Sequence, residues 1–371
     1  TKINFHGKEI IDIVNKFFEI RKKETNSNYL NNDIANEVWE EQVNFSTLNI
    51  DANYLISSSA AVQGIVRIQR ATIEGKNVCR IVQTSNGTGN NPSATDPVFK
   101  NEVVIDETTY ELVAICGGAF ASSTNLKGKI TIPASIKSIG GSAFKDCKAL
   151  TSLVFENASD KTKETNLSII GDSAFEGCTG LTSGDTAALS LPSSLKYIGD
   201  KAFKACSALN TKIDFNTNIH ETLKFIGKNA FDGCTKLSGG LHLPSTIEFI
   251  GEYAFNSCSG LNEDLILPAN DNFKTISNST FASCGFNGLL RLPSTVETID
   301  TYAFKGNKFT SVVLSKNLKT IGENAFLDCA TIENEILYIP NDVKTIGNYA
   351  FKGCTSIKQL QLGNSVKTIG D

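Results

Sequence analysis

The feature that most constrains this chain is a short residue pattern that recurs about ten times in its C-terminal two thirds. One copy runs from Ile226-Gly227 through Ala230-Phe231 to Cys234, and Leu241-His242-Leu243-Pro244 follows it. A chain of 371 residues would ordinarily form two or three domains. Stacked repeats instead build one elongated body, because each copy buries its apolar side chains against its neighbours. The repetition therefore predicts a solenoid.

The phenylalanine of each copy gives the period of the repeat. Successive phenylalanines lie 22 to 31 residues apart, and this drift excludes a coiled coil and suits turns that accept insertions. The set is Phe120, Phe144, Phe175, Phe203, Phe231, Phe255, Phe281, Phe304, Phe326 and Phe351. At about 4.8 Å per coil, the intervals between them predict a sheet roughly 43 Å long.

Two segments of each copy predict strands. In Leu241–Pro244 the leucines would point inward and the central residue outward, and the proline would end the strand because it has no N–H to donate. These Leu-x-Leu strands are expected to stack as one parallel sheet. A second apolar pair, such as Val343 and Ile346, predicts another short strand on the return side of each coil.

Two further positions of the repeat predict turns. The residue after the return-side isoleucine is glycine in most copies, for example Gly227, and is replaced at Ser277 and Asp300. This set predicts a tight turn and is compatible with positive φ at that residue. The unit made of a small residue, Phe, two variable residues and Cys predicts a single helical or 3₁₀ turn that places Phe in the core.

The chain before the repeats has a different pattern. Ile10, Val14 and Phe17 fall on one helical face, and Asp33 is a candidate N-cap for a second helix. Strand patterns then predict hairpins over 65–82 and 103–113. We divide the chain into a helical plus β-hairpin domain or extended cap (1–85), a loop and capping hairpin (86–118), and the solenoid (119–371).

The pattern Ile-Gly-x-x-Ala-Phe-x-x-Cys-x-x-Leu followed by Leu-x-Leu-Pro, repeated over residues 115–371, resembles the BspA-type leucine-rich repeat family of bacterial and protozoan surface proteins. The resemblance implies an α/β solenoid: a curved, right-handed leucine-rich-repeat superhelix with a parallel β-sheet, preceded by an N-terminal α/β cap or small domain. It also implies an exported protein, surface-attached or secreted, that adheres to host proteins or other cells. The family has no shared catalytic residues, so only scaffold positions carry over.

The repeated cysteines are the first candidates for chemistry, because each lies three residues after a repeat phenylalanine. Stacked coils would bring their Cα atoms within the range of a disulfide, but their side chains would point the same way. Ser123 and Asn307 replace cysteine in two copies, and neither can join a disulfide or easily replace a thiolate zinc ligand. Buried structural thiols are therefore favoured over disulfides or a metal site. The eight are Cys147, Cys178, Cys206, Cys234, Cys258, Cys284, Cys329 and Cys354.

Composition and motifs exclude several function classes. A net charge of −4 argues against a nucleic-acid partner, and no run of about 18 apolar residues predicts a membrane span. Metalloprotease, serine-hydrolase and nucleotide-binding motifs are absent, so we predict no catalytic residue, no metal and no cofactor. No secretory signal begins at Thr1, so an exported protein would carry its signal outside this sequence.

The outward-facing strand positions vary between copies and carry the functional information of the repeats. Exposed aliphatic residues beside arginine and tyrosine are typical of a partner surface, while an ordinary solvated exterior is the alternative. The candidate binding residues are Asp214, His242, Asp264, Ile266, Leu289, Arg291, Val313 and Tyr338.

We therefore predict a non-catalytic, cell-surface or secreted protein. It would bind a host protein or another cell-surface protein through the concave face of its sheet. Two alternatives stay open: a structural spacer that displays the N-terminal domain, and an enzyme whose site lies in the N-terminal third.

Substituting Phe231→Ala should lower the free energy of unfolding by about 3–5 kcal/mol, as large truncations in a core do. Urea unfolding of wild type and variant measures this difference. Identical unfolding curves would contradict a buried phenylalanine ladder.

Overall fold

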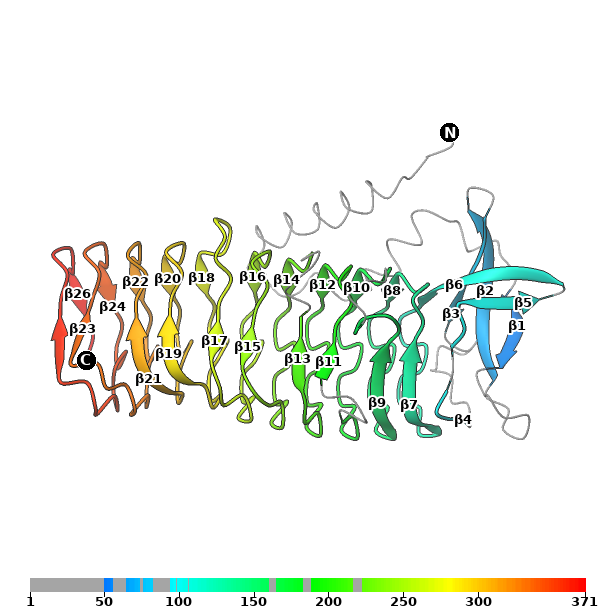
Figure 1. The fold of residues 1–371 in the computed structure, drawn as a ribbon, viewed down its shortest axis with the longest axis horizontal. Coiled ribbons are helices and arrows are strands. Elements are labelled where there is room, and N and C mark those ends of the chain that lie inside the picture. The colour runs from blue at the N-terminus through cyan, green and yellow to red at the C-terminus, as the bar shows by residue number, and fades with distance from the viewer. Residues whose placement is uncertain are drawn as a thin grey trace.

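The computed structural model describes residues 50–55, 65–73, 76–82, 94–97, 99–105, 107–159, 165–182, 188–215 and 222–371. They form an elongated solenoid of stacked coils, and none of these residues is helical (Figure 1). The leucine-rich-repeat solenoid predicted from the repeats is confirmed. The helices predicted around Ile10 and after Asp33 lie outside the described residues.

Each coil contributes one strand to each of two sides of the solenoid, which run as two rows along its length (Figure 1). On the side that we call the return face, all strands have two residues and end on isoleucine. They are β8 (Ser138–Ile139), β10 (Ile169–Ile170), β12 (Tyr197–Ile198), β14 (Phe225–Ile226), β16 (Phe249–Ile250), β18 (Thr275–Ile276), β20 (Thr298–Ile299), β22 (Thr320–Ile321), β24 (Thr345–Ile346) and β26 (Thr368–Ile369).

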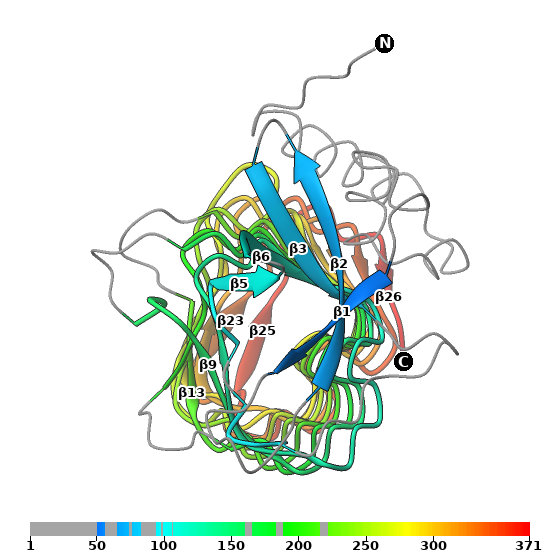
Figure 2. The same ribbon diagram turned by 90° about the vertical axis from the view of Figure 1, so that its right-hand side faces the viewer.

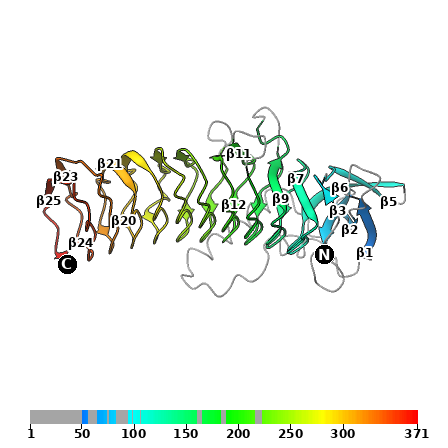
Figure 3. The ribbon, with the colours of Figure 1, turned by 90° about the horizontal axis from the view of Figure 1, so that it is seen from below.

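The opposite side, which we call the Leu-x-Leu face, holds strands of two to seven residues (Figure 3). They are β7 (Leu126–Ile132), β9 (Leu150–Phe155), β11 (Ala188–Ser190), β13 (Lys212–Asp214), β15 (Leu241–His242), β17 (Leu265–Ile266), β19 (Asn287–Arg291), β21 (Lys308–Val313), β23 (Ile336–Tyr338) and β25 (Gln359–Gln361). Leucines at both ends of the motif, such as Leu241 and Leu243, are buried in the core, as the two-residue period of a strand requires.

The two faces differ in continuity, and here the sequence-based expectation was wrong. The Leu-x-Leu strands do not stack as one sheet but pair in twos, or in three where β4 (Ala94–Thr95) joins β7 and β9. Between β21 and β23, the Asn334 side chain takes the place of a strand by bonding both the N–H and the C=O of Val312. The return strands form the longer sheets, one from β6 to β16 and another from β18 to β26.

The N-terminal strands extend the return-face sheet. They are β1 (Ile50–Leu55), β2 (Ile65–Ile73), β3 (Lys76–Val82), β5 (Glu102–Ile105) and β6 (Thr108–Ile115), in the order β1-β2-β3-β6-β8 with β5 on β6. Both predicted hairpins, β2–β3 and β5–β6, are confirmed. Viewed along the solenoid axis, these strands cross its end (Figure 2). The division of the chain at residues 85 and 118 stays a prediction.

The phenylalanine turn differs from the predicted helical turn. Around Phe231, three overlapping bonds link residues three apart: Ala230 to Gly227, Asp232 to Asn229, and Cys234 to Phe231. Asn229 and Gly233 have positive φ, 56° and 76°, so the chain reverses its hand twice and cannot continue as a helix. The unit is therefore a series of β-turns.

The glycine that recurs in most copies of the repeat allows the backbones of two coils to lie close together; it does not adopt positive φ. Gly227 N donates to Ile198 O at 2.8 Å, and a Cβ built on Gly227 would lie 2.5 Å from Asp200 N in the preceding coil. Where Ser277 replaces this glycine, its Oγ bonds Ile250 O at 2.7 Å, and the return-face sheet breaks between β16 and β18.

The distances between stacked phenylalanine rings also differ between coils with and without this glycine. Neighbouring rings stack at 5.1 to 5.4 Å where the later coil carries glycine. The centroid distance is 5.8 Å both from Phe255 to Phe281 and from Phe281 to Phe304. In these two steps the later coil carries Ser277 or Asp300 in place of the glycine. Glycine thus sets the tight spacing of the coils. Nine of the ten rings are buried; Phe351, in the last coil, is partly buried.

The repeated cysteines form a second ladder beside the rings. Each thiol donates to the carbonyl oxygen of the phenylalanine one coil earlier, at 3.0 to 3.1 Å; Cys234 bonds Phe203 in this way. None of the ten cysteines forms a disulfide, and all ten are buried. In one of the two copies that lack cysteine, Asn307 Nδ2 donates to Phe281 O at 2.7 Å. The shared requirement is therefore a small buried donor.

Gly227→Ala should lower the free energy of unfolding by about 1–3 kcal/mol, because the added methyl group overpacks the contact between coils. Chemical denaturation measures the loss. Asp300→Ala is the matched control at the same repeat position, where a Cβ already fits, and should cost clearly less. Equal losses would contradict the close-approach argument.

The thiols make stability fall in alkali. Burial raises the pKa of Cys147 and Cys329 to about 12, and that of Cys354 to about 11, above the ordinary value of 9.0. Since the unfolded chain loses these protons first, stability is full below about pH 9 and falls as pH rises toward 11–12.

We expect the urea midpoint to fall between pH 8 and pH 10.5, and native thiols to resist Ellman's reagent at pH 8. Cys147→Ser keeps a donor, as Ser123 does in its copy, and should reduce the alkaline loss. Rapid labelling of the folded protein would contradict buried thiols.

Candidate binding surface

The eight candidate binding residues share the Leu-x-Leu face. Seven have exposed side chains, whereas Asp214 is half-buried. Strand register pairs His242 with Ile266 and Arg291 with Val313. Asp214 and Tyr338 hold the equivalent position on β13 and β23, so these six residues form one row of equivalent repeat positions. In chain order the row is Asp214, His242, Ile266, Arg291, Val313 and Tyr338, and Asp264 and Leu289 lie two residues before Ile266 and Arg291.

One part of this surface is charged and internally paired. His242 Nε2 lies 2.9 Å from Asp264 Oδ1 in the next coil, and Lys212 Nζ lies 3.2 Å from Glu263 Oε2. The Lys212 side chain crosses an intervening coil to reach that carboxylate. Gly239 leaves room for this crossing, since a Cβ there would lie 2.5 Å from Lys212 Cε, and Gly240 leaves room for Asp264, whose Oδ1 would lie 2.4 Å from a Cβ. These polar groups satisfy one another, and exposed pairs of this kind contribute little to stability.

The adjacent part is apolar and surrounds one cation. Ile266, Leu289, Val313 and Tyr338 are 49%, 45%, 38% and 59% exposed. Arg291 lies among them, two residues after Leu289 on β19 and opposite Val313 on β21. Within the described ranges, the Arg291 guanidinium forms no ion pair and no side-chain hydrogen bond. We call these five residues the Arg291 patch.

The Arg291 patch combines the two properties of a binding hot spot. Its aliphatic and aromatic side chains remain in water, although a strand surface that only needs solvation would carry threonine, lysine or serine. The guanidinium is planar, permanently charged and able to donate two parallel hydrogen bonds to a carboxylate. The surface is thus suited to a partner that offers a carboxylate beside apolar side chains.

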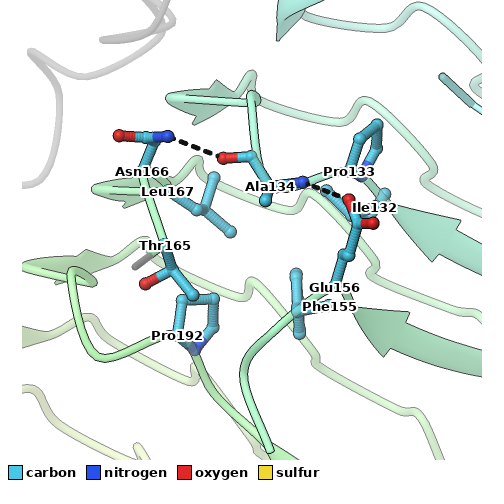
Figure 4. A pocket seen from close by; sticks show the side chains of 9 residues that line it. All are labelled: Ile132, Pro133, Ala134, Phe155, Glu156, Thr165, Asn166, Leu167 and Pro192. Atoms are coloured by element: carbon cyan, nitrogen blue, oxygen red, sulfur yellow. Dashed lines mark hydrogen bonds between the residues drawn. The ribbon is translucent and has the colours of Figure 1, made fainter. Parts of the chain in front are cut away.

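Two hollows in the described part of the chain differ from this surface. One, behind Pro133 and Pro192, has about 10 Å³, room for about one water molecule. Its polar atoms bond within the wall: Ala134 N donates to Glu156 Oε2 at 2.8 Å, and Asn166 Nδ2 donates to Ala134 O at 2.9 Å (Figure 4). The other hollow, of about 480 Å³, lies at the last coil and is lined by residues that include Phe351, Leu360 and Ile369.

The described part of the chain contains no cluster of three or more histidine, cysteine or carboxylate side chains that could hold a metal ion. A search of the same residues for a helix long and apolar enough to cross a membrane found none.

The chain belongs to the BspA-type leucine-rich repeat family. The family model for the BspA-type leucine-rich repeat region matches overlapping segments at 98–220, 155–284, 215–333 and 274–371. These matches cover every coil described above. No curated protein matches the chain.

Solved structures resemble this chain at low sequence identity. The pneumococcal vaccine antigen PcpA is 21% identical, with a TM-score of 0.50, over 86% of this chain and 85% of that one. A leucine-rich cell surface protein of Faecalibacterium prausnitzii is 18% identical, with a TM-score of 0.40, over 85% of this chain and 95% of that one. A leucine-rich repeat protein of Bacteroides ovatus is 20% identical, with a TM-score of 0.40, over 82% and 89%.

Sequence reasoning missed Glu263, the partner of Lys212. Its position next to Asp264 gives no outward-facing signal, and its partner lies 51 residues away, two coils back. The one available signal was the Gly239-Gly240 pair, which removes side chains from the coil between them.

Proposed function

We propose that this protein is a non-catalytic, surface-attached or secreted member of its family that binds another protein through the Arg291 patch. The carrying observation is the exposed Arg291 guanidinium, flanked by Ile266, Leu289 and Val313, with Tyr338 two coils further along. Arginine and tyrosine are the residue types that dominate binding energy at protein interfaces. Location at the cell surface follows from family membership and belongs to the same proposal.

The proposed partner is a protein segment with a carboxylate and apolar side chains, on a host or neighbouring cell. Coils advance about 5 Å each, the spacing between neighbouring strands of a sheet, so the patch presents its side chains as a closely spaced row along the solenoid axis. The paired charges of Lys212, Glu263, His242 and Asp264 border it and form a polar rim on one side. A dry centre with a polar rim is the common arrangement of a protein interface.

Arg291→Glu should weaken binding to host cells or matrix by roughly thirtyfold or more, the loss of a hot-spot residue of about 2 kcal/mol. Arg291→Lys should lose part of this affinity, because an ammonium cannot form the planar, two-point contact. Flow cytometry of labelled protein on cells, or surface plasmon resonance on immobilised matrix proteins, measures the change. Thermal unfolding should match wild type.

Lys344→Glu is the matched control, since it reverses one exposed charge beside the return strand β24. If Arg291→Glu and Lys344→Glu reduce binding equally, the effect is one of net charge and the patch is not the contact. Wild-type binding by an Arg291→Glu/Tyr338→Ala variant would favour the spacer alternative, in which the solenoid displays the N-terminal domain.

A further inference from the structure

The edge of the solenoid formed by the phenylalanine turns carries a tyrosine in every second coil from β16 to β24. These tyrosines lie two residues before the repeat phenylalanine, and we call this position the turn row. Backbone bonds hold the row in register, as where Tyr302 N donates at 3.0 Å to Glu323 O, just before the row residue of the next coil. In chain order the turn row reads Tyr253, Ser279, Tyr302, Asn324 and Tyr349.

The backbone of the turn row does not favour tyrosine. Tyr253, Tyr302 and Tyr349 have φ of 59°, 55° and 56°, a conformation that bulky side chains seldom adopt. The coils between them carry Ser279 and Asn324 at φ of 53° and 55°, so the same turn forms with a small polar residue. Strain that the fold does not require points to a role in binding.

A second position of the turn alternates with the same two-coil period. Lys305 Nζ lies over the Tyr302 ring, 5.4 Å from its centroid, and Lys352 Nζ lies 4.7 Å from the centroid of the Tyr349 ring. The coil between them has Leu327 at this position, which carries no charge. From Tyr302 onward, every second coil therefore presents one aromatic ring with one cation beside it.

The rings are more accessible than the residues between them. Tyr349 is 42% exposed and Tyr302 is half-buried, whereas Ser279 and Asn324 are only 4% and 5% exposed. The tyrosines and lysines, and not the intervening row residues, are thus the groups that a ligand on this edge would meet.

The charge that this edge offers is positive. Among the described residues, neither Lys305 nor Lys352 forms an ion pair with a carboxylate. The exposed carboxylate between their coils, Glu323, accepts a hydrogen bond from Asn324 Nδ2 at 3.1 Å. An acidic ligand would therefore find two ammonium groups without a carboxylate partner.

The spacing of the rings selects the kind of polymer that fits. The phenylalanine rings beneath advance by 5.3 to 5.8 Å per coil from β16 to β24, so the tyrosines recur about every 11 Å. An extended peptide repeats every two residues, about 7 Å, and does not match this period. An extended β-linked polysaccharide turns each sugar over relative to the last, so it presents the same sugar face once per disaccharide, a comparable length.

We propose that the turn row binds an extended acidic polysaccharide in which neutral sugars alternate with uronic acids. Each disaccharide would pack the apolar C–H face of one sugar against a tyrosine ring and place one carboxylate near Lys305 or Lys352. Polymer and edge then share both the period and the sequence of ring and charge. This inference does not depend on the function proposed above, which concerns the Leu-x-Leu face.

Isothermal titration calorimetry with a hyaluronan decasaccharide, which alternates an uncharged amino sugar with a uronic acid, tests the proposal. Tyr302→Asn/Tyr349→Asn gives these coils the residue that Asn324 already supplies at the same position. The affinity should fall about tenfold or more, because two ring contacts are lost. Thermal unfolding should match or exceed wild type, since asparagine accepts positive φ more readily than tyrosine.

The contribution of charge is tested with a matched pair of variants. Lys305→Gln/Lys352→Gln should weaken hyaluronan binding several-fold. Lys316→Gln/Lys358→Gln, which removes two exposed charges away from the turn row, should leave it unchanged. An uncharged chitin oligosaccharide of the same length should bind more weakly than hyaluronan.

Four results would overturn the proposal. They are no binding of the hyaluronan decasaccharide, wild-type affinity in the tyrosine variant, equal affinity for the chitin oligosaccharide, and equal affinity for a polyglutamate chain of the same charge. The last result would show that negative charge alone is recognised and that the rings have no part in binding.

Discussion

Backbone contact between successive coils governs the rest of this structure. At Gly227 and its equivalents, the main chain of one coil lies so close to the next that a single methyl group would clash with a backbone nitrogen. That approach sets the return strands at hydrogen-bonding distance and the phenylalanine rings at stacking distance. It also brings each cysteine thiol within reach of a carbonyl one coil away. A sheet, a ring ladder and a thiol ladder thus share one spacing.

Much of this architecture could be predicted from the residues, because each copy repeats the same few apolar positions. The solenoid, the inward leucines and both N-terminal hairpins followed from periodicity alone. Which face forms the longer sheets could not be predicted, since hydrogen bonding between coils depends on loop side chains such as Asn334. The sequence alone also could not show why glycine recurs after the return-side isoleucine, because a close approach between coils and a positive φ both favour glycine. Ser277 and Asp300, with the wider ring spacing beside them, distinguish the two explanations.

The candidate surface shows a similar limit. The outward positions of the Leu-x-Leu strands were predictable, and Ile266, Leu289 and Arg291 lie where the two-residue period places them. The division of that face into two parts, one of paired polar side chains and one of apolar side chains around Arg291, was not predictable. It depends on contacts between residues such as Lys212 and Glu263, whose separation in the chain varies with the length of each coil.

The break between β16 and β18 has a thermodynamic consequence for the whole array. In a linear repeat protein each coil is stabilised by its immediate neighbours, and cooperativity passes along the chain through those interfaces. At this step the return-face sheet stops, the rings are further apart, and a serine hydroxyl replaces a backbone donor. The β15–β17 pair and the backbone bonds of the phenylalanine turns still join these two coils, so the array stays continuous there but is held on one face only. A linear array opens first where its neighbours are least well joined, which places the first opening under heat or denaturant near residue 276 rather than at a change of domain.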